Sequence, residues 1–169
     1  TFFMNVSYNI GGYTFSLDNI EHGILRCNEP KRKQFNDNDK RIQFILDPPI
    51  DPRIHASLVC GAKSCPPIRV FDVNNLDKGL DLAIKTFCDN EIEIKSDNSN
   101  SFGKKVFMNK ILYWYRYDFG INYSKQISKM SQYCNDIKRA LLTDISKVIN
   151  DDNVSDYIVF KEYDWNSNN

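Results

Sequence analysis

The sequence lacks an excess of either charge, because Lys and Arg together number 22 and so do Asp and Glu. A neutral chain releases few counterions on contact with nucleic acid or an anionic membrane, which argues against binding to either. The sequence also lacks any apolar run near the ~20 residues that span a bilayer. Residues 1–4 have neither the basic start nor the long apolar middle of a signal peptide. We therefore predict a protein that binds neither nucleic acid nor a membrane.

The five cysteines lack the pattern of a disulfide framework, because their number is odd and their spacing irregular. This favours a reducing compartment, and we expect a cytoplasmic protein. Histidine is scarcer still, and His22 and His55 are the only two. An imidazole base must therefore be one of these two residues or come from a partner chain. Because Cys60 and Cys65 lie within ten residues of His55, we expect thiol–imidazole chemistry in that segment.

What is present is an ordinary globular composition, with 41% hydrophobic and 26% charged residues in a chain of 169. This length suits one domain with a real core. We predict an α+β fold in which helices pack on a small antiparallel sheet, as a single domain over residues 1–165 followed by a disordered tail over residues 166–169. The expected strands cover residues 2–16 (a hairpin turning at Gly11-Gly12), 54–60, 91–95, 102–108 and 156–165. The expected helices cover residues 17–27, 76–88, 110–118, 124–134 and 136–149.

Four islands of the sequence resemble one known family. They read YNIGGYTFSLDNIEHGILR (residues 8–26), DPRIHASLVCGAKSCPP (51–67), ILYWYRYDFG (111–120) and YDW (163–165). Their order and spacing are similar to those of the domain of unknown function 547 (DUF547) family, across nearly the whole chain. Members usually carry an Asn- and aromatic-rich helix before the glycine hairpin, so the resemblance implies an N-terminally incomplete domain. It attaches no firm activity, and a distant similarity to papain-like or transglutaminase-like folds is analogy alone.

The second island carries the candidate chemistry. Cys65 is held just before Pro66-Pro67 and is our candidate nucleophile, with His55 as its base. An imidazole base needs an orienting carboxylate, for which Asp51 and Asp164 are the preferred candidates and Asp118 a third. We expect a cysteine-dependent hydrolase or acyl-transferase acting on a peptide or protein.

Two further groups of residues belong to this hypothesis. Arg53 and Arg26 are candidates to bind an anionic group of the substrate. Glu21 and His22 share the helix of Arg26 and, with Asp51-Pro52-Arg53, could make a buried polar network. Aromatic residues 113–119 are expected mainly in the core.

Three alternatives remain open at this stage. Cys60 and Cys65 are spaced as in some zinc or redox sites, and they could also form a disulfide. The same motifs could build a non-catalytic module that binds a peptide or protein. Alternatively, the cysteines and His55 are structural, as buried small side chains and a satisfied imidazole. We expect no cofactor and no metal ligands.

Overall fold

The computed structural model describes residues 2–168 and has the predicted α+β fold. It divides into two compact units, unit 1 up to Asp51 and unit 2 from Pro52 onward, which are described separately below. The expectation of a single domain over residues 1–165 therefore stays a prediction. The family-like hairpin lies in unit 1, and the cysteine-rich island lies in unit 2 except for its first residue.

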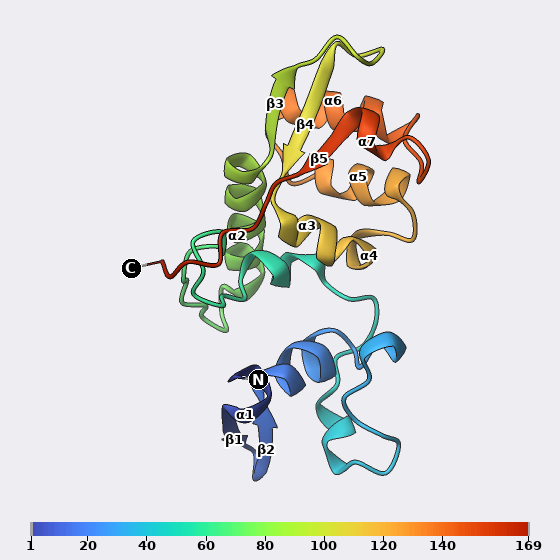
Figure 1. The fold of residues 1–169 in the computed structure, drawn as a ribbon. Helices are drawn as coiled ribbons and strands as arrows, with labels where there is room; N and C mark the ends of the chain where they lie inside the picture. Colours follow the sequence, from blue (N-terminus) through green and yellow to red (C-terminus); the bar gives the residue numbers. More distant parts are fainter. Residues whose placement is uncertain (1, 169) are drawn as a thin grey trace. The chain divides into compact units, whose positions relative to one another are not determined.

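Unit 1 begins with a short α-helix, a β-hairpin and a π-helix (Figure 1). Its elements are α1 (Phe2–Asn5), β1 (Ser7–Ile10), β2 (Tyr13–Ser16), η1 (Asn19–Leu25), η2 (Pro30–Arg32) and η3 (Lys40–Phe44). The predicted hairpin is confirmed, with β1 and β2 antiparallel. Its turn uses φ values of +59° at Gly11 and +82° at Gly12, which only glycine adopts without strain. The hairpin is shorter than predicted, because residues 2–5 form a helical turn instead of a strand.

The small core of unit 1 is aromatic. Phe15 and Phe35 are fully buried and meet edge to face, with ring centroids 6.2 Å apart. Phe44 packs on Phe15 at 5.4 Å. Gly23 of η1 lies against Phe35 so closely that a Cβ there would come within 2.3 Å of the ring. The glycine is therefore required by packing, because no larger residue leaves space for the ring.

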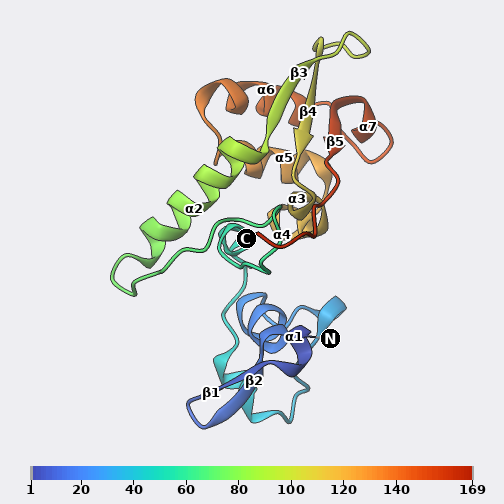
Figure 2. The ribbon, with the colours of Figure 1, turned by 60° about the vertical axis from the view of Figure 1, so that its left-hand side comes forward.

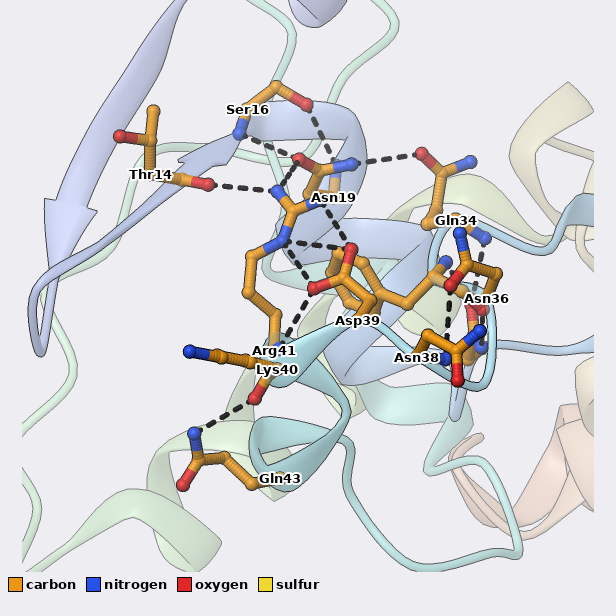
Figure 3. A network of polar contacts seen from close by, with 12 residues as sticks. Thr14, Ser16, Asn19, Gln34, Asn36, Asn38, Asp39, Lys40, Arg41 and Gln43 are labelled. Carbon is orange, nitrogen blue, oxygen red and sulfur yellow. Dashed lines mark hydrogen bonds and ion pairs between the residues drawn. The ribbon is translucent and has the colours of Figure 1, made fainter.

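Arg41 ties the elements of unit 1 together through a network of polar contacts (Figure 3). Its guanidinium donates to both carboxylate oxygens of Asp39, to the Thr14 carbonyl at 2.9 Å and to Asn19 Oδ1 at 3.0 Å. The same group lies 4.7 Å from the centroid of the Phe35 ring. One side chain thus joins β2, η1 and η3, which is a typical use of the planar guanidinium fork.

Unit 2 contains a mixed sheet and most of the helices (Figures 1 and 2). Its elements are η4 (Pro52–Ala56), α2 (Leu76–Glu91), β3 (Glu93–Ser96), β4 (Lys104–Met108), α3 (Lys110–Trp114), α4 (Arg116–Phe119), α5 (Tyr123–Ser131), α6 (Asp136–Ser146), α7 (Val154–Tyr157) and β5 (Ile158–Phe160). The sheet order is β3-β4-β5. β3 and β4 pair as the predicted antiparallel hairpin, whereas β5 lies parallel to β4.

One core holds unit 2 together. Its fully buried side chains come from α2, β4, α3, α5 and α6, and they include Ile84, Met108, Leu112, Ile127 and Leu142. Helices α5 and α6 pack against one another, and α2 packs on η4. The described residues include no helix that is long and apolar enough to cross a bilayer.

The main error of the sequence analysis lies at residues 54–60, where the expected buried strand is absent. Pro52–Ala56 instead forms the short helix η4, and the following residues are irregular. Pro52 is the first residue of η4, a position where its fixed φ and missing N–H carry no penalty. Residues 54–56 of η4 are buried, which accounts for the apolar character of this stretch. A short apolar stretch does not distinguish a strand from a helical turn.

Candidate functional site

The loop between η4 and α2 brings two thiols together. Gly61 turns the chain with φ +86°, and the Cys65 N–H donates to the Ala62 carbonyl at 3.0 Å. As a result, the Sγ atoms of Cys60 and Cys65 lie 2.9 Å apart, within hydrogen-bonding distance. The backbone N–H of Cys60 also donates to Cys65 Sγ at 3.1 Å. Cys60 is exposed and Cys65 is half-buried, so solvent reaches the pair from the Cys60 side.

Tyr163 completes this site from the other end of the sequence. Its hydroxyl lies 3.1 Å from Cys65 Sγ and 3.4 Å from Cys60 Sγ. Tyr163 follows β5 in the segment that runs back along the cysteine loop (Figures 1 and 2). Tyr163 belongs to the last family-like island, but its role was not predicted from the sequence, because residues about a hundred positions apart give no spacing signal.

Backbone hydrogen bonds fasten the C-terminal segment to the cysteine loop. Lys63 N–H donates to the Asn166 carbonyl at 2.9 Å, Asn168 N–H donates to the Gly61 carbonyl at 3.0 Å, and Ala62 and Ser167 form a β-bridge. The Ser64 hydroxyl accepts from the Asp164 N–H at 2.9 Å. Residues 166–168, for which we predicted disorder, thus pair with the loop, while Asn169 lies outside the described residues.

The hydrogen bonds make the two thiols unequal. Partial burial by itself raises the pKa of Cys60, but hydrogen bonds from Cys65 and Tyr163 outweigh burial and bring the pKa below its ordinary value of 9.0. Burial raises the pKa of Cys65, and its hydrogen bond to Cys60 raises it further. Burial and the two sulfur contacts also raise the pKa of Tyr163, so its hydroxyl stays protonated and remains a donor. Cys60 is therefore the thiol that ionises first.

An aromatic cluster adjoins the two thiols. The Tyr163 ring packs against two indoles, with centroid distances of 4.9 Å to Trp114 and 4.5 Å to Trp165. The indoles themselves are 5.7 Å apart. Trp114 is 42% exposed and Trp165 68% exposed, so much of their surface faces solvent. The expectation that residues 113–119 serve mainly the core applies to buried Phe119 but not to Trp114.

His55 has a carboxylate partner, which is Asp118. His55 Nε2 lies 2.7 Å from Asp118 Oδ2, and the side chains are only 1% and 2% exposed. The imidazole also stacks on the Tyr115 ring, with centroids 3.9 Å apart. Asp118, the third of our candidate orienting residues, therefore contacts the imidazole. The roles of Asp51 and Asp164 in orienting His55, and of Cys65 as its thiol, stay predictions.

The other predicted residues of unit 2 make contacts of their own. Arg53 donates to Asp81 at 2.8 Å and to Asp77 at 2.7 Å, so its guanidinium joins η4 to the first turns of α2. Asp164 accepts hydrogen bonds from the backbone and the side chain of Asn166. Both bonds lower the pKa of Asp164, and the backbone bond has the larger effect. Each of the two residues thus has a local structural role. The proposed anion contact of Arg53 stays a prediction.

Unit 1 holds a second polar group, made by Glu21, His22 and Arg26. Arg26 donates to His22 Nδ1 at 2.9 Å, so the Nε2 atom carries the proton and points toward Glu21 at 3.5 Å. His22 is 2% exposed, and burial lowers its pKa below 6.5 despite the raising effect of Glu21. These three residues thus place a buried neutral imidazole between two charges, while the predicted extension of the network to Asp51 and Arg53 stays a prediction. Its role in substrate binding stays a prediction.

Among residues 2–168, no group of three or more His, Cys, Asp and Glu side chains is arranged to hold a metal ion. The pair Cys60 and Cys65 therefore lacks the further ligands that a tetrahedral zinc site requires. The chemistry that this arrangement offers is that of two neighbouring thiols.

Comparison with known protein families gives a match over the N-terminal half. Residues 1–88, just over half of the chain, match the family described as "Protein of unknown function, DUF547". The match includes the two longer family-like islands, while residues 111–120 and 163–165 lie outside it. Comparison with curated proteins gives no match, and comparison with solved structures gives none. The likeness to papain-like or transglutaminase-like folds stays a prediction.

Proposed function

The chain belongs to the DUF547 family, and from its site we propose that Cys60 and Cys65 are a redox-active dithiol. In this proposal the pair exchanges with the disulfide of a peptide or protein and becomes a disulfide itself. The observation that carries the proposal is the 2.9 Å separation of the two sulfur atoms at the protein surface. Among the alternatives left open by the sequence, this one needs no residue beyond those in contact.

The loop is suited to closing and opening such a bond. A disulfide has an S–S length of about 2.05 Å, so the sulfur atoms need to approach by only about 1 Å. The four residues between the cysteines include Gly61, whose positive φ gives the tight turn. The reduced form is supported as well, because each sulfur accepts or donates a hydrogen bond within the site.

The reaction is a pair of thiol–disulfide exchanges. The Cys60 thiolate attacks one sulfur of the substrate disulfide, forming a mixed disulfide and releasing the first substrate thiolate. The Cys65 thiolate then attacks Cys60 Sγ, forming the Cys60–Cys65 disulfide and releasing the second substrate thiolate. The two protons given up by the cysteines are taken by the two departing thiolates, directly or through water. The protein is oxidised by two electrons and the substrate disulfide is reduced by two.

The contacts assign the two roles. Cys60 attacks because it is exposed and has the lowered pKa, which makes it the larger source of thiolate at neutral pH. Cys65 is half-buried and resolves the mixed disulfide from within hydrogen-bonding distance. Tyr163 donates to either sulfur, and the Cys60 N–H donates to Cys65 Sγ. These donors stabilise whichever sulfur carries the negative charge.

The test is to equilibrate the protein with mixtures of reduced and oxidised glutathione and to digest it with trypsin without reduction. Cleavage after Arg53, Lys63 and Arg69 puts the two cysteines on separate peptides, residues 54–63 and 64–69. The expected product is these peptides joined and two hydrogen masses lighter than their sum. Cys60→Ser and Cys65→Ser should each abolish it, whereas Cys27→Ser should not. Independent glutathione adducts on both cysteines, with no linked peptide at any ratio, would overturn the proposal.

The cysteine-dependent hydrolase or acyl-transferase is kept as a second candidate, because His55 has the orienting carboxylate that an imidazole base requires. In that case Cys65 would be the nucleophile and Cys60 dispensable. Hydrolysis of a thioester or activated ester by the Cys60→Ser variant, with loss of this activity in Cys65→Ser, would favour it. Equal loss of reactivity in both cysteine variants would favour the dithiol.

A further inference from the structure

We infer that the aromatic cluster of Trp114, Tyr163 and Trp165 is the docking surface for the substrate of the dithiol. The partner it fits is an extended peptide, or an exposed protein segment, with a large apolar side chain close to its half-cystine. The inference rests on the proposed function, which supplies the disulfide chemistry. It adds the class of substrate and the residues that select it.

The cluster and the thiols form one continuous surface, because Tyr163 belongs to both. Its hydroxyl contacts the two sulfur atoms at 3.1 and 3.4 Å, and its ring contacts the two indoles. The path from sulfur to indole therefore runs through a single tyrosine side chain. An extended peptide advances about 3.3 Å per residue. A residue within about three positions of the half-cystine attached to Cys60 would thus reach the indoles.

The exposed indoles favour an apolar ligand group. Trp165 is 68% exposed and Trp114 42% exposed, and both already stack on aromatic neighbours. An apolar or aromatic side chain laid on them removes apolar surface from water on both partners, and ring–ring contacts add to that gain. Tryptophan and tyrosine are also enriched among the residues that dominate binding at interfaces. The cluster therefore has the composition of a binding anchor.

Hydrogen bonds to the cysteine loop fix the backbone on both sides of Trp165. The preceding residue, Asp164, donates its N–H to Ser64 Oγ at 2.9 Å, and the following residue, Asn166, accepts from Lys63 N–H at 2.9 Å. The side chains of residues 163 and 165 lie on one face of this extended segment, as their ring contact shows. A preorganised aromatic surface loses little conformational freedom on binding.

The experiment compares two model disulfides in exchange with the reduced protein. Each is a tripeptide of sequence X-Cys-Gly, with blocked ends and joined to 2-mercaptoethanol, where X is Phe in one and Ser in the other. The wild type should react about three- to tenfold faster with the Phe peptide, as expected for one aromatic contact. Trp165→Ser should remove that preference. The matched control is Ile137→Ser, which alters an exposed apolar residue of α6, outside the cluster. This variant should keep the preference for the Phe peptide.

A second measurement separates failure of docking from failure of the chemistry. The Cys60→Ser/Cys65→Ser variant should bind the reduced Phe peptide, with a change in tryptophan fluorescence that the Ser peptide does not cause. Suppose that the protein exchanges with 2-hydroxyethyl disulfide but shows no preference for the Phe peptide and does not bind it. This result would contradict the docking inference and leave the proposed dithiol function standing. If the protein exchanges with no disulfide, the proposed dithiol function is wrong. Binding of the reduced Phe peptide would then still test whether the aromatic cluster is a docking surface. A dimer at rising concentration that Trp165→Ser abolishes would assign the cluster to self-association and contradict the inference.

Discussion

His55 Nε2 lies 2.7 Å from Asp118 Oδ2, and both side chains are almost completely shielded from water. The contact joins η4 to α4 across 63 residues of sequence. A buried carboxylate is costly unless it is hydrogen bonded, so each of the two residues depends on the other. The imidazole is further fixed by stacking on Tyr115. The pair thus anchors the segment that leads into the cysteine loop.

Replacing Asp118 by Ala should destabilise unit 2 by about 3–5 kcal/mol, because it leaves His55 buried without its partner. Asp118→Asn should cost less, about 1–3 kcal/mol, because the amide oxygen still accepts a hydrogen bond from the imidazole. Urea unfolding of the purified variants measures both. Asp144→Asn is the control, since its ion pair with Lys147 is exposed and should contribute about 0–1 kcal/mol. Equal effects of Asp118→Ala and Asp144→Asn would contradict the structural role of the pair.

Gly23→Ala should destabilise unit 1. The added Cβ would come within 2.3 Å of the buried Phe35 ring, which is too close for any real contact. Overpacking of this kind costs about 1–3 kcal/mol. Phe35→Leu should relieve the clash, so the double variant should lose less stability than the sum of the two single ones. Simple additivity in a double-mutant cycle, measured by denaturant unfolding, would count against this contact.

Tyr163→Phe should slow alkylation of the Cys60 thiol at neutral pH while leaving the aromatic cluster in place. The hydroxyl helps to lower the pKa of Cys60, and a hydrogen bond to a charged group is worth about 1.5–3 kcal/mol. The rate with iodoacetamide at pH 7 should therefore fall about tenfold. In the wild type, the pH–rate profile should have its midpoint below 9.0. An unchanged rate and midpoint in Tyr163→Phe would show that the hydroxyl does not act on the thiol.

The stability of unit 1 should fall in strong acid, when the carboxylate of Asp39 becomes protonated. Hydrogen bonds from Arg41 lower the pKa of this carboxyl from 3.8 to about 2 in the folded chain. Because the folded pKa is the lower one, the contribution to stability is complete above about pH 4 and is lost as pH falls through about 2. Carboxyl NMR titration should place the Asp39 midpoint near pH 2, and Arg41→Met should move it upward. A midpoint near 3.8 in the wild type would contradict the Arg41 network.

The sequence alone predicted the elements whose patterns are local. The glycine hairpin of unit 1, helix α2 and the β3–β4 hairpin are confirmed, because each depends on turn residues or on a long apolar periodicity. The single aromatic helix expected over residues 110–118 is divided at Tyr115 into α3 and α4. The parallel pairing of β5 with β4 was not predicted, since a long-range pairing has no signature in spacing.

The candidate site was predictable only in part. The island around Cys60, Cys65 and His55 was identified from the scarcity of histidine and the density of cysteine. The partners were not, because Tyr163 reaches the thiols from about a hundred residues away and Trp165 reaches Tyr163 through the tail. The expected strand at residues 54–60 was also wrong, because Pro52–Ala56 forms the short helix η4 instead.

The phenol that contacts Cys60 and Cys65 is supplied by a residue near the end of the sequence. During synthesis the cysteines leave the ribosome about a hundred residues before Tyr163 does, and domains acquire structure in that order of emergence. A nascent chain therefore carries the two sulfurs without the Tyr163 hydroxyl and without the backbone bridge between Ala62 and Ser167. Until Tyr163 has been synthesised, the finished site therefore does not limit the exposure of the two thiols to oxidants.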